Sequence, residues 1–281
     1  MRRRVAITRN LTKAWLLLLV PASAMGFLGW QLDGYRIALL FTGSVVLLAA
    51  ALYVNADRTV MGMIGATPLL PVEAPAFHSM VESLSARAGV MRPRLYILRD
   101  GYPRALSAGR GPHGGAALAV SVGLLSVATP AELEGIVAHE LAHLRHRDTI
   151  VQTSAVTIAG AIIESSRLGG WFQRGMLVVL GPLAASCVHS LLSPKREYEA
   201  DRFAANLCGS PHGLADALVR LELAAGLVTF EASPATEPLY VVNPFADEGL
   251  AKLFVTHPPL GERVSRLRAL DPEWREKLRA A

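Results

Sequence analysis

Two long apolar stretches near the N-terminus dominate the hydrophobic pattern of this chain. They run from Ala14 to Trp30 and from Ile37 to Val54, with a short polar segment between them. At about 1.5 Å per helical residue, each stretch covers most of a hydrocarbon core of about 30 Å. Aromatic residues typical of the membrane–water interface lie near their ends, namely Trp15, Trp30, Tyr35 and Tyr53. The pattern predicts a transmembrane hairpin over residues 1–56.

The charges around the first stretch predict its orientation. Basic residues precede it at Arg2, Arg3, Arg4, Arg9 and Lys13, whereas the short loop from Gln31 to Arg36 carries one acid and one arginine. An excess of Lys and Arg marks the cytoplasmic side, so both ends of the hairpin are expected in the cytoplasm. A cleaved signal peptide is the alternative, because Ala22-Ser23-Ala24 resembles a cleavage site. Apolar residues continue past Ala24, however, and the second stretch follows at once.

Residues 57–281 carry the mixed signals of a globular domain. Ala76 to Ala88 has helical periodicity and ends at Gly89, Pro93 to Arg99 alternates like a strand, and Ala116 to Val122 is a second β-like run. The short stretch from Val60 to Ala66 is expected to be a connector. The predicted fold class is therefore α+β and mostly helical, with a small β-sheet behind the N-terminal hairpin.

Two further apolar stretches are inserted in this domain, at about residues 150–163 and 176–192. Both carry polar residues, and the first is short for a membrane span. Either both cross the membrane, or both pack as a buried or interfacial helical hairpin. In either case the chain returns to the side from which it came.

Composition agrees with a chain that is part membrane protein and part globular domain. Hydrophobic residues make up 52% and charged residues 18% of the 281 residues. The net charge of +5 does not indicate nucleic-acid binding, because the arginines are scattered and much of the excess lies at the N-terminus. Cys187 and Cys208 are the two cysteines, which implies neither a disulfide framework nor a thiolate metal site.

The segment from Thr129 to Arg147 has the strongest helix signals. Thr129 is placed to act as N-cap with Glu132 at the capping-box spacing, and Pro130 suits the first helical position. Apolar residues then recur at helical spacing, at Leu133, Val137, Leu141 and Leu144. A helix that buries this stripe is expected here.

An HExxH signature, His139-Glu140-Leu141-Ala142-His143, lies on that helix. His139 and His143 are one turn apart on one face, where two neutral imidazoles can hold one zinc ion, and Glu140 is placed to take a proton from the attacking water. A charged, solvated helix face is the alternative. The apolar surroundings favour a metal site, because burying ionisable groups is costly unless they are paired or bound to metal.

A third ligand is expected on the segment that follows the inserted stretches. Ser193 and Pro194 predict the start of a helix, and Cys208-Gly209 its end. Glu197 and Asp201 share one face of it, so one could bind zinc while the other accepts a hydrogen bond from a ligand histidine. Glu199 points roughly the opposite way. A surface helix of ion pairs, with Lys195 and Arg196 beside the acids, is the alternative.

The strand before the metal helix is a candidate substrate platform. In zinc peptidases such a strand commonly offers a free edge to which an extended peptide adds, which would make its six residues the substrate-binding ones. These are Ala116, Ala117, Leu118, Ala119, Val120 and Ser121. An ordinary core strand is the alternative.

Three ordered motifs resemble those of the HtpX-type membrane zinc metalloproteases, relatives of the CAAX prenyl protease Ste24. They are HELAH followed by HRD at 146–148, REYEAD at 196–201 and THPPLGER at 256–263. The resemblance implies a gluzincin-type fold with one zinc ion per chain, bound by His139, His143 and Glu197. It further implies Glu140 as general base, Asp201 behind the ligands, and His257 and Arg263 close to the site, where His257 could stabilise the oxyanion.

One position departs from the family pattern. Members commonly carry an Asn-Ala pair after the first strand, where it is thought to contact the substrate, and here Arg104 precedes Ala105. Arginine still donates hydrogen bonds but is longer and always charged. The departure bears on substrate preference more than on the chemistry.

The expected function is that of a membrane endopeptidase of the bacterial inner membrane, with its catalytic domain in the cytoplasm. By resemblance, its polypeptide substrates are damaged or misfolded membrane proteins. Two alternatives are an intramembrane site-2-type protease, which would use Asp33 of the Leu32-Asp33-Gly34 motif as a ligand, and a non-catalytic adaptor stabilised by zinc. The adaptor has no need of Glu140, and structural zinc usually has four protein ligands rather than three.

Overall fold

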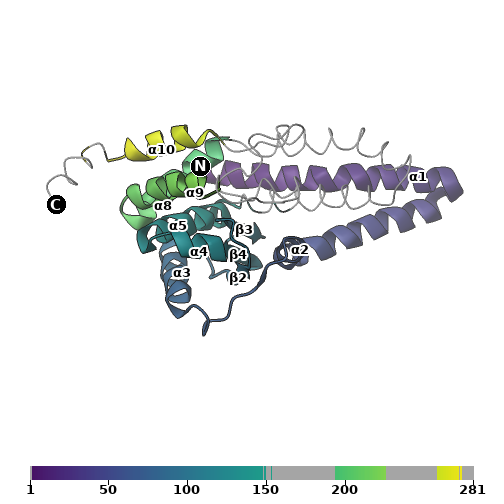
Figure 1. Cartoon of the computed structure of the whole chain (residues 1–281). Helices are drawn as coiled ribbons and strands as arrows, with labels where there is room; N and C mark the ends of the chain where they lie inside the picture. The colour runs from purple at the N-terminus through teal and green to yellow at the C-terminus, as the bar shows by residue number, and fades with distance from the viewer. Residues whose placement is uncertain are drawn as a thin grey trace.

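The structure is a computed structural model of the whole chain (Figure 1). It describes residues 2–147, 149, 153, 194–225, 258–271 and 273, without the side chains of residues 2–21 and of a few later positions in the first helix. The inserted stretches at 150–163 (Thr153 apart) and 176–192 lie outside the described residues, as do Cys187 and His257.

Helix α1 (Arg2–Val54) is bent back on itself, with a break at two residues. Asp33 (φ −154°, ψ 41°) and Gly34 (φ 66°, ψ −151°) leave the helical conformation, and Figure 1 shows the two arms folding back from this break. A Cβ atom on Gly29 would lie 2.7 Å from the backbone of Ile37 and Ala38, so glycine allows the arms to approach closely. Among the described residues, no helix combines the length and the apolar character that a membrane crossing requires.

Within the described residues, the sheet has four strands in the order β1-β2-β4-β3. They are β1 (Thr67–Pro68), β2 (Arg94–Leu98), β3 (Ala105–Gly109) and β4 (Ala116–Ser121). β4 pairs in parallel with β2, from Arg94 opposite Ala117 to Leu98 opposite Ser121, and antiparallel with β3. The expected fold class, a mostly helical α+β protein with a small sheet, is confirmed.

The expectation that β4 offers a free edge is wrong. It has a hydrogen-bonded neighbour on each side, and its six residues, Ala116, Ala117, Leu118, Ala119, Val120 and Ser121, are all buried. β3 carries little strand signal, because its sequence, ALSAG, lacks the β-branched and aromatic residues typical of strands. In the described part of the sheet, β3 is the strand next to the metal helix. β4 is an ordinary core strand, which was the alternative to a substrate platform.

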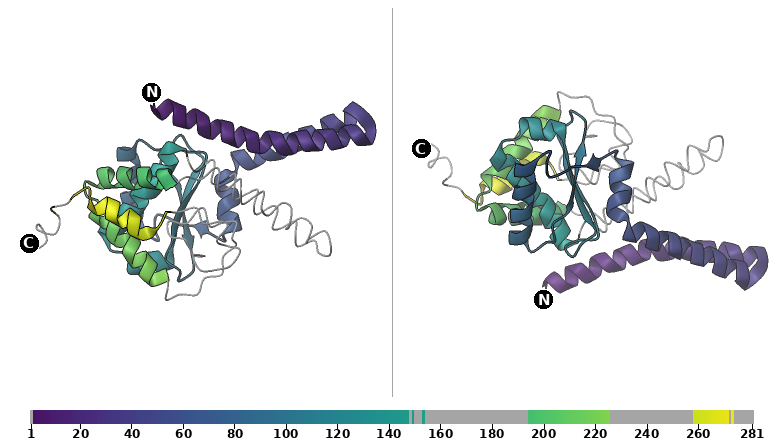
Figure 2. Two further views of the ribbon diagram at one scale, coloured as in Figure 1. Left: turned by 90° about the horizontal axis from the view of Figure 1, so that it is seen from above. Right: turned by 90° about the horizontal axis from the view of Figure 1, so that it is seen from below.

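Helices cover both faces of this sheet (Figure 2). On one face, Ala105, Leu118 and Val120 pack in the main core with residues of α3 (Pro75–Ala88) and α5 (Pro130–His146). On the other, Leu106 and Ala108 pack against Val60 and Met61 of α2 (Ala56–Met63), a helix where a connector was expected. α2 follows α1 after one residue and therefore joins the N-terminal hairpin to the sheet.

Helix α5 forms as the sequence predicts. The Thr129 side chain accepts from the Glu132 amide, and the Thr129 amide donates to Glu132 Oε2 at 2.7 Å, which completes the capping box. The helix ends at Arg147, which adopts the left-handed conformation (φ 61°). The short helix α4 (Val122–Val127) leads into it from β4 and is capped by Ser121.

In the described C-terminal part of the chain, three helices pack around α5. α8 (Pro194–Cys208) and α9 (His212–Ala225) pack directly on α5, and α10 (Leu260–Arg268) packs on α8 and α9. A Cβ atom on Gly135 would lie 2.6 Å from the Leu214 amide, so a glycine is needed where α5 crosses α9. This arrangement brings α8 beside the HExxH face of α5.

Candidate metal centre

The HExxH residues lie on the buried side of α5, between the sheet and α8. His139, Glu140 and His143 are only 1%, 3% and 4% exposed. Groups of this kind are rarely buried unless they are paired or bind a metal. The solvated-face alternative does not fit this burial.

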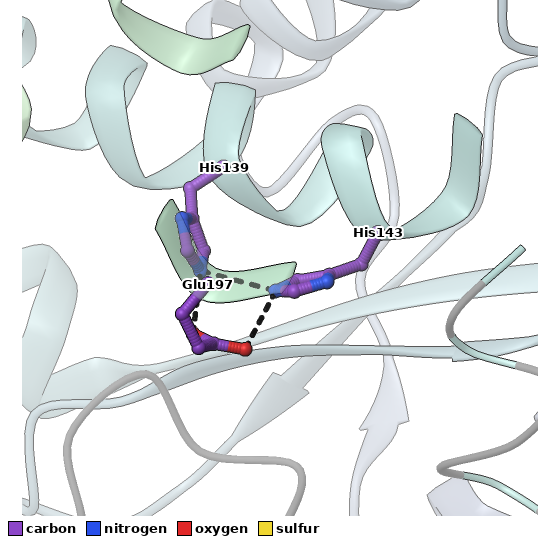
Figure 3. Close-up of side chains that lie close together, drawn as sticks. All are labelled: His139, His143 and Glu197. Atoms are coloured by element: carbon purple, nitrogen blue, oxygen red, sulfur yellow. Dashed lines mark hydrogen bonds and ion pairs between the residues drawn. The ribbon is translucent and has the colours of Figure 1, made fainter. Parts of the chain in front are cut away.

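Glu197 of α8 meets the two histidines (Figure 3). Nε2 of His139 lies 3.2 Å from Nε2 of His143, and these nitrogens lie 3.6 and 3.5 Å from the two carboxylate oxygens of Glu197. The three potential ligand atoms are all within 4.8 Å of one another. Donor atoms placed about 2.0–2.1 Å from a tetrahedral zinc ion are about 3.3–3.4 Å apart, so these separations fit zinc.

Asp201, one turn after Glu197 on α8, holds His139 from behind. Its Oδ1 lies 2.9 Å from Nδ1 of His139, and Asp201 is 4% exposed. An ionised carboxylate at Nδ1 keeps the proton there and leaves the Nε2 lone pair directed at the cluster. A metal-binding histidine needs this tautomer.

Arg263 of α10 supplies a buried positive charge next to Asp201 and Glu197. It is 1% exposed and donates from Nε and Nη2 to the two carboxylate oxygens of Asp201 at 2.9 and 2.7 Å. Its Nη1 also lies 3.7 Å from Oε2 of Glu197. A bidentate arginine fixes a carboxylate in one plane, so Arg263 orients the group that orients His139.

Electrostatics in this cluster favour added positive charge. Burial opposes protonation of His139, but the hydrogen bonds to Asp201 and Glu197 outweigh it and raise the pKa of His139 to about 9. Burial likewise opposes ionisation of Asp201, yet the charge and hydrogen bonds of Arg263 lower its pKa to about 2. A site that stabilises an extra proton on the imidazole is also one that attracts a cation between its donors.

Residues 71–271 of the chain match Peptidase family M48. The chain belongs to this family. It is 36% identical over 279 residues to the protease HtpX homolog of Pelotomaculum thermopropionicum, with 93% of this chain and 99% of that protein covered. It is 39% identical over 279 residues to the protease HtpX homolog of Acidiphilium cryptum, with coverages of 92% and 96%. A solved structure, that of S. mikatae Ste24p, aligns with a TM-score of 0.48 and 18% identity over 94% of this chain and 63% of that one.

Together with the buried donor set, membership in the family makes this chain a zinc metalloprotease of the HtpX type, which acts on polypeptides. The resemblance seen in the sequence motifs is confirmed. The His139, His143 and Glu197 set is consistent with the zinc site of an M48 peptidase.

Other residues considered as ligands lie apart from the centre. Glu199 is exposed and lies 3.9 Å from Lys195, so the ion-pair interpretation holds for that face of α8 but not for Glu197. Asp33 is at the break in α1, and Figures 1 and 2 show this break at the far end of the hairpin from α5 and α8. The ligand set of the site-2-type alternative is therefore not assembled in this M48 peptidase.

Arg104 lies just before β3 and contacts the loop that precedes it. It is 7% exposed, and its Nη2 donates to Asp100 Oδ2 at 2.6 Å. The Arg104 amide donates to Oγ of Ser121, which also caps α4. These contacts tie the start of β3 to the end of β4.

Two residues near the centre were missed in the sequence. Ser107 of β3 is buried and lies with its Oγ 3.3 Å from the backbone carbonyl of Glu140, which joins the sheet to the metal helix. Tyr198 of α8 follows Glu197 and contacts α10. Neither carried a local signal, because Ser107 lies in the unrecognised strand and Tyr198 acquires its partners only when α10 docks.

Proposed function

We propose that this M48 peptidase is a membrane-anchored endopeptidase whose catalytic domain, residues 57–281, is held at the cytoplasmic face by the hairpin of residues 1–56. The observation that carries the catalytic part is the convergence of His139, His143 and Glu197 with Asp201 at Nδ1 of His139. Such a carboxylate behind the imidazole is typical of metal-binding histidines, and three protein ligands are the number that a catalytic zinc site uses.

The roles of the buried residues follow from their placement. His139, His143 and Glu197 hold one zinc ion per chain. When bound, zinc would act as a Lewis acid that polarises the scissile carbonyl and makes water a better nucleophile at neutral pH. Glu140, next to His139 and buried beside the ligands, takes the proton of the attacking water and delivers it to the leaving amine.

Charge balance supports the same assignment. Of the residues that the structure describes, three carboxylates, those of Glu140, Glu197 and Asp201, and the guanidinium of Arg263 lie at the centre. The formal charges of one divalent ion and Arg263 equal those of the three carboxylates. Because net charge is costly in a buried site, a divalent cation suits this set of side chains.

Two further residues are assigned by position. His257 precedes buried Pro258 and leads into α10, whose Arg263 reaches the centre, so we assign His257 to stabilisation of the oxyanion. Arg104 is assigned an influence on substrate preference, because it directly precedes β3, the strand that contacts the metal helix.

The membrane assignment rests on the hairpin. Its described positions expose many large apolar side chains, among them Phe27, Trp30, Leu32, Leu39 and Leu47 at 60–73% exposure. A water-soluble domain rarely exposes so many together, whereas lipid would cover them. The basic N-terminus supports a cytoplasmic location for both ends of the hairpin. By similarity to the HtpX family, misfolded or damaged membrane proteins are the proposed substrates.

Purified full-length protein in detergent tests the proposal. We expect about one zinc ion per chain and cleavage of casein that a chelator abolishes and added zinc restores. Protein that binds zinc but cleaves neither casein nor itself would favour the adaptor alternative.

A further inference from the structure

The aromatic ring next to the zinc ligand on α8 is held by two side chains of α10. Tyr198 is half-buried, and burial together with the nearby Glu262 carboxylate raises the pKa of its hydroxyl. Cζ of Arg266 lies 4.0 Å from the ring centroid, a cation–π distance. Arg266 also donates to Glu262 from Nη2 at 2.8 Å and from Nε at 3.1 Å. The three side chains form a cluster that spans the two helices, with Arg266 in contact with both of the others.

This cluster adjoins the most deeply buried contact of α10, that of Arg263 with Asp201. Arg263 follows Glu262 directly and lies in the same helical turn as Arg266. On α8, Tyr198 and Asp201 are three residues apart and therefore neighbours on one face. α10 is thus attached to α8 at two adjacent points, one half-exposed at Tyr198 and one buried at Asp201.

We propose that Tyr198, Glu262 and Arg266 form a clip that positions Arg263 in the metal centre. The proposal rests on the zinc site proposed above and makes Tyr198 a positioning residue, since it acts on the ligands through Arg263. The clip sets the rotation and the axial position of α10 on α8. Those two variables decide whether the guanidinium reaches both Asp201 and Glu197.

The position of α10 affects the metal centre because the buried contact between Arg263 and Asp201 tolerates little movement. Arg263 is 1% exposed and makes two hydrogen bonds of 2.7 and 2.9 Å to one carboxylate. A small slide or rotation of α10 would break this geometry and leave buried carboxylates poorly compensated. Asp201 would then hold His139 less firmly, and zinc would bind more weakly.

Other contacts of α10 do not replace the clip. Arg268 lies 3.2 Å from Asp216, and His212 lies 3.1 Å from Asp271, so both of these pairs join the C-terminal part of α10 and the residues after it to α9. They hold the far end of the helix. The contacts of Arg266 with Tyr198, and of Arg263 with Asp201 and Glu197, instead join α10 to the ligand-bearing helix.

The test measures zinc affinity by competition with a chelator, and hydrogen–deuterium exchange of residues 260–268 in the metal-free protein. We expect Tyr198→Ala to weaken zinc binding roughly tenfold, within the range of residues that support metal ligands, and to speed exchange in α10. Tyr198→Phe keeps the aromatic ring under Arg266, so its zinc affinity should fall less than that of Tyr198→Ala. Two matched controls, Glu199→Ala on α8 and Ser265→Ala on α10, should stay within about twofold of wild type because both side chains are exposed outside the clip.

A double-mutant cycle separates positioning from general destabilisation. If Tyr198 acts through Arg263, Tyr198→Ala should change zinc affinity little once Arg263→Gln is present. An equal fold-change in both backgrounds, or wild-type zinc affinity in Tyr198→Ala, would overturn the proposal. Should Tyr198→Ala fail to fold, Glu262→Gln takes its place in the same cycle. Because the readouts are affinity and exchange, wild-type protein that binds zinc without proteolysis would contradict the proposed function and leave this test intact.

Discussion

Oδ1 of Asp201 lies 2.9 Å from Nδ1 of His139, on the opposite side of the imidazole from Nε2, which faces His143 and Glu197. One carboxylate thereby selects the tautomer and the ring orientation of a ligand on another helix. Arg263 fixes that carboxylate in turn. The metal centre is therefore a chain of contacts from α10 through α8 to α5.

Replacing Asp201 by asparagine tests the middle contact of this series, which links α8 to His139. Asp201→Asn keeps the size of the side chain but removes the charge that holds Nδ1–H and pairs with Arg263. We expect zinc affinity to fall about 10- to 100-fold. Chelator competition measures it, with Glu199→Gln on the same helix as the control. Unchanged affinity in Asp201→Asn would show that His139 is oriented by other groups.

Glu140→Gln should separate chemistry from metal binding. The amide occupies the same space but takes up no proton, so zinc content should stay at the wild-type value while casein cleavage falls about 100-fold or more. Glu134→Gln, a change at a half-buried position on the same helix outside the metal centre, is the matched control. Proteolysis at the wild-type rate in Glu140→Gln would contradict a general-base role.

Glu197, rather than Glu199 or Asp33, should complete the zinc site. Glu197→Ala removes the carboxylate that lies 3.5–3.6 Å from both histidines, so zinc occupancy and activity should be lost. Glu199→Ala and Asp33→Ala should resemble wild type, because one side chain is exposed and the other lies at the far turn of α1. Metal analysis of the three purified variants decides this. Full occupancy in Glu197→Ala with loss in Asp33→Ala would favour the site-2-type alternative.

The start of α5 should be a pH-dependent contributor to stability. Burial raises the pKa of Glu132, but hydrogen bonds from Thr129 and Arg220 outweigh it and lower the pKa below its usual value of 4.5. A lowered folded-state pKa means that this contribution is present above the unfolded pKa and is lost as the pH falls through the folded value. Glu132→Gln should lower the free energy of unfolding by about 1–2 kcal/mol at pH 7, since Arg220 is half-exposed.

Denaturant unfolding at several pH values measures that difference. The gap between wild type and Glu132→Gln should narrow as the pH is lowered below about 4.5. Glu134→Gln, whose partner Arg87 is 48% exposed at 3.5 Å, should show a much smaller effect at every pH. A gap that does not change with pH would mean that Glu132 acts through packing alone.

Topology reporters test the orientation of the hairpin. A reporter fused after Ala281, and one fused to a chain truncated after Gly89, should both be found in the cytoplasm, because the basic residues precede the first apolar stretch. A periplasmic signal from both fusions would instead support the cleaved signal peptide.

Local patterns in the sequence were sufficient for the two helices that carry the ligands. The capping box at Thr129 and the periodicity after it predicted α5, and Pro194 with Gly209 bounded α8. Helical spacing alone then placed His139 with His143, and Glu197 with Asp201, on single faces. Such features depend on neighbours within one or two turns, which is why the residues nearby suffice to predict them.

Contacts between distant segments were decided only by the tertiary structure. β3 has little strand propensity of its own and forms because it pairs with β4, and this pairing makes β4 an inner strand. Likewise Arg263 and Tyr198 gain their roles only when α10 docks on α8. Strand order and helix docking depend on how buried surfaces fit across the whole domain, and a local pattern of hydrophobic and polar residues does not contain that information.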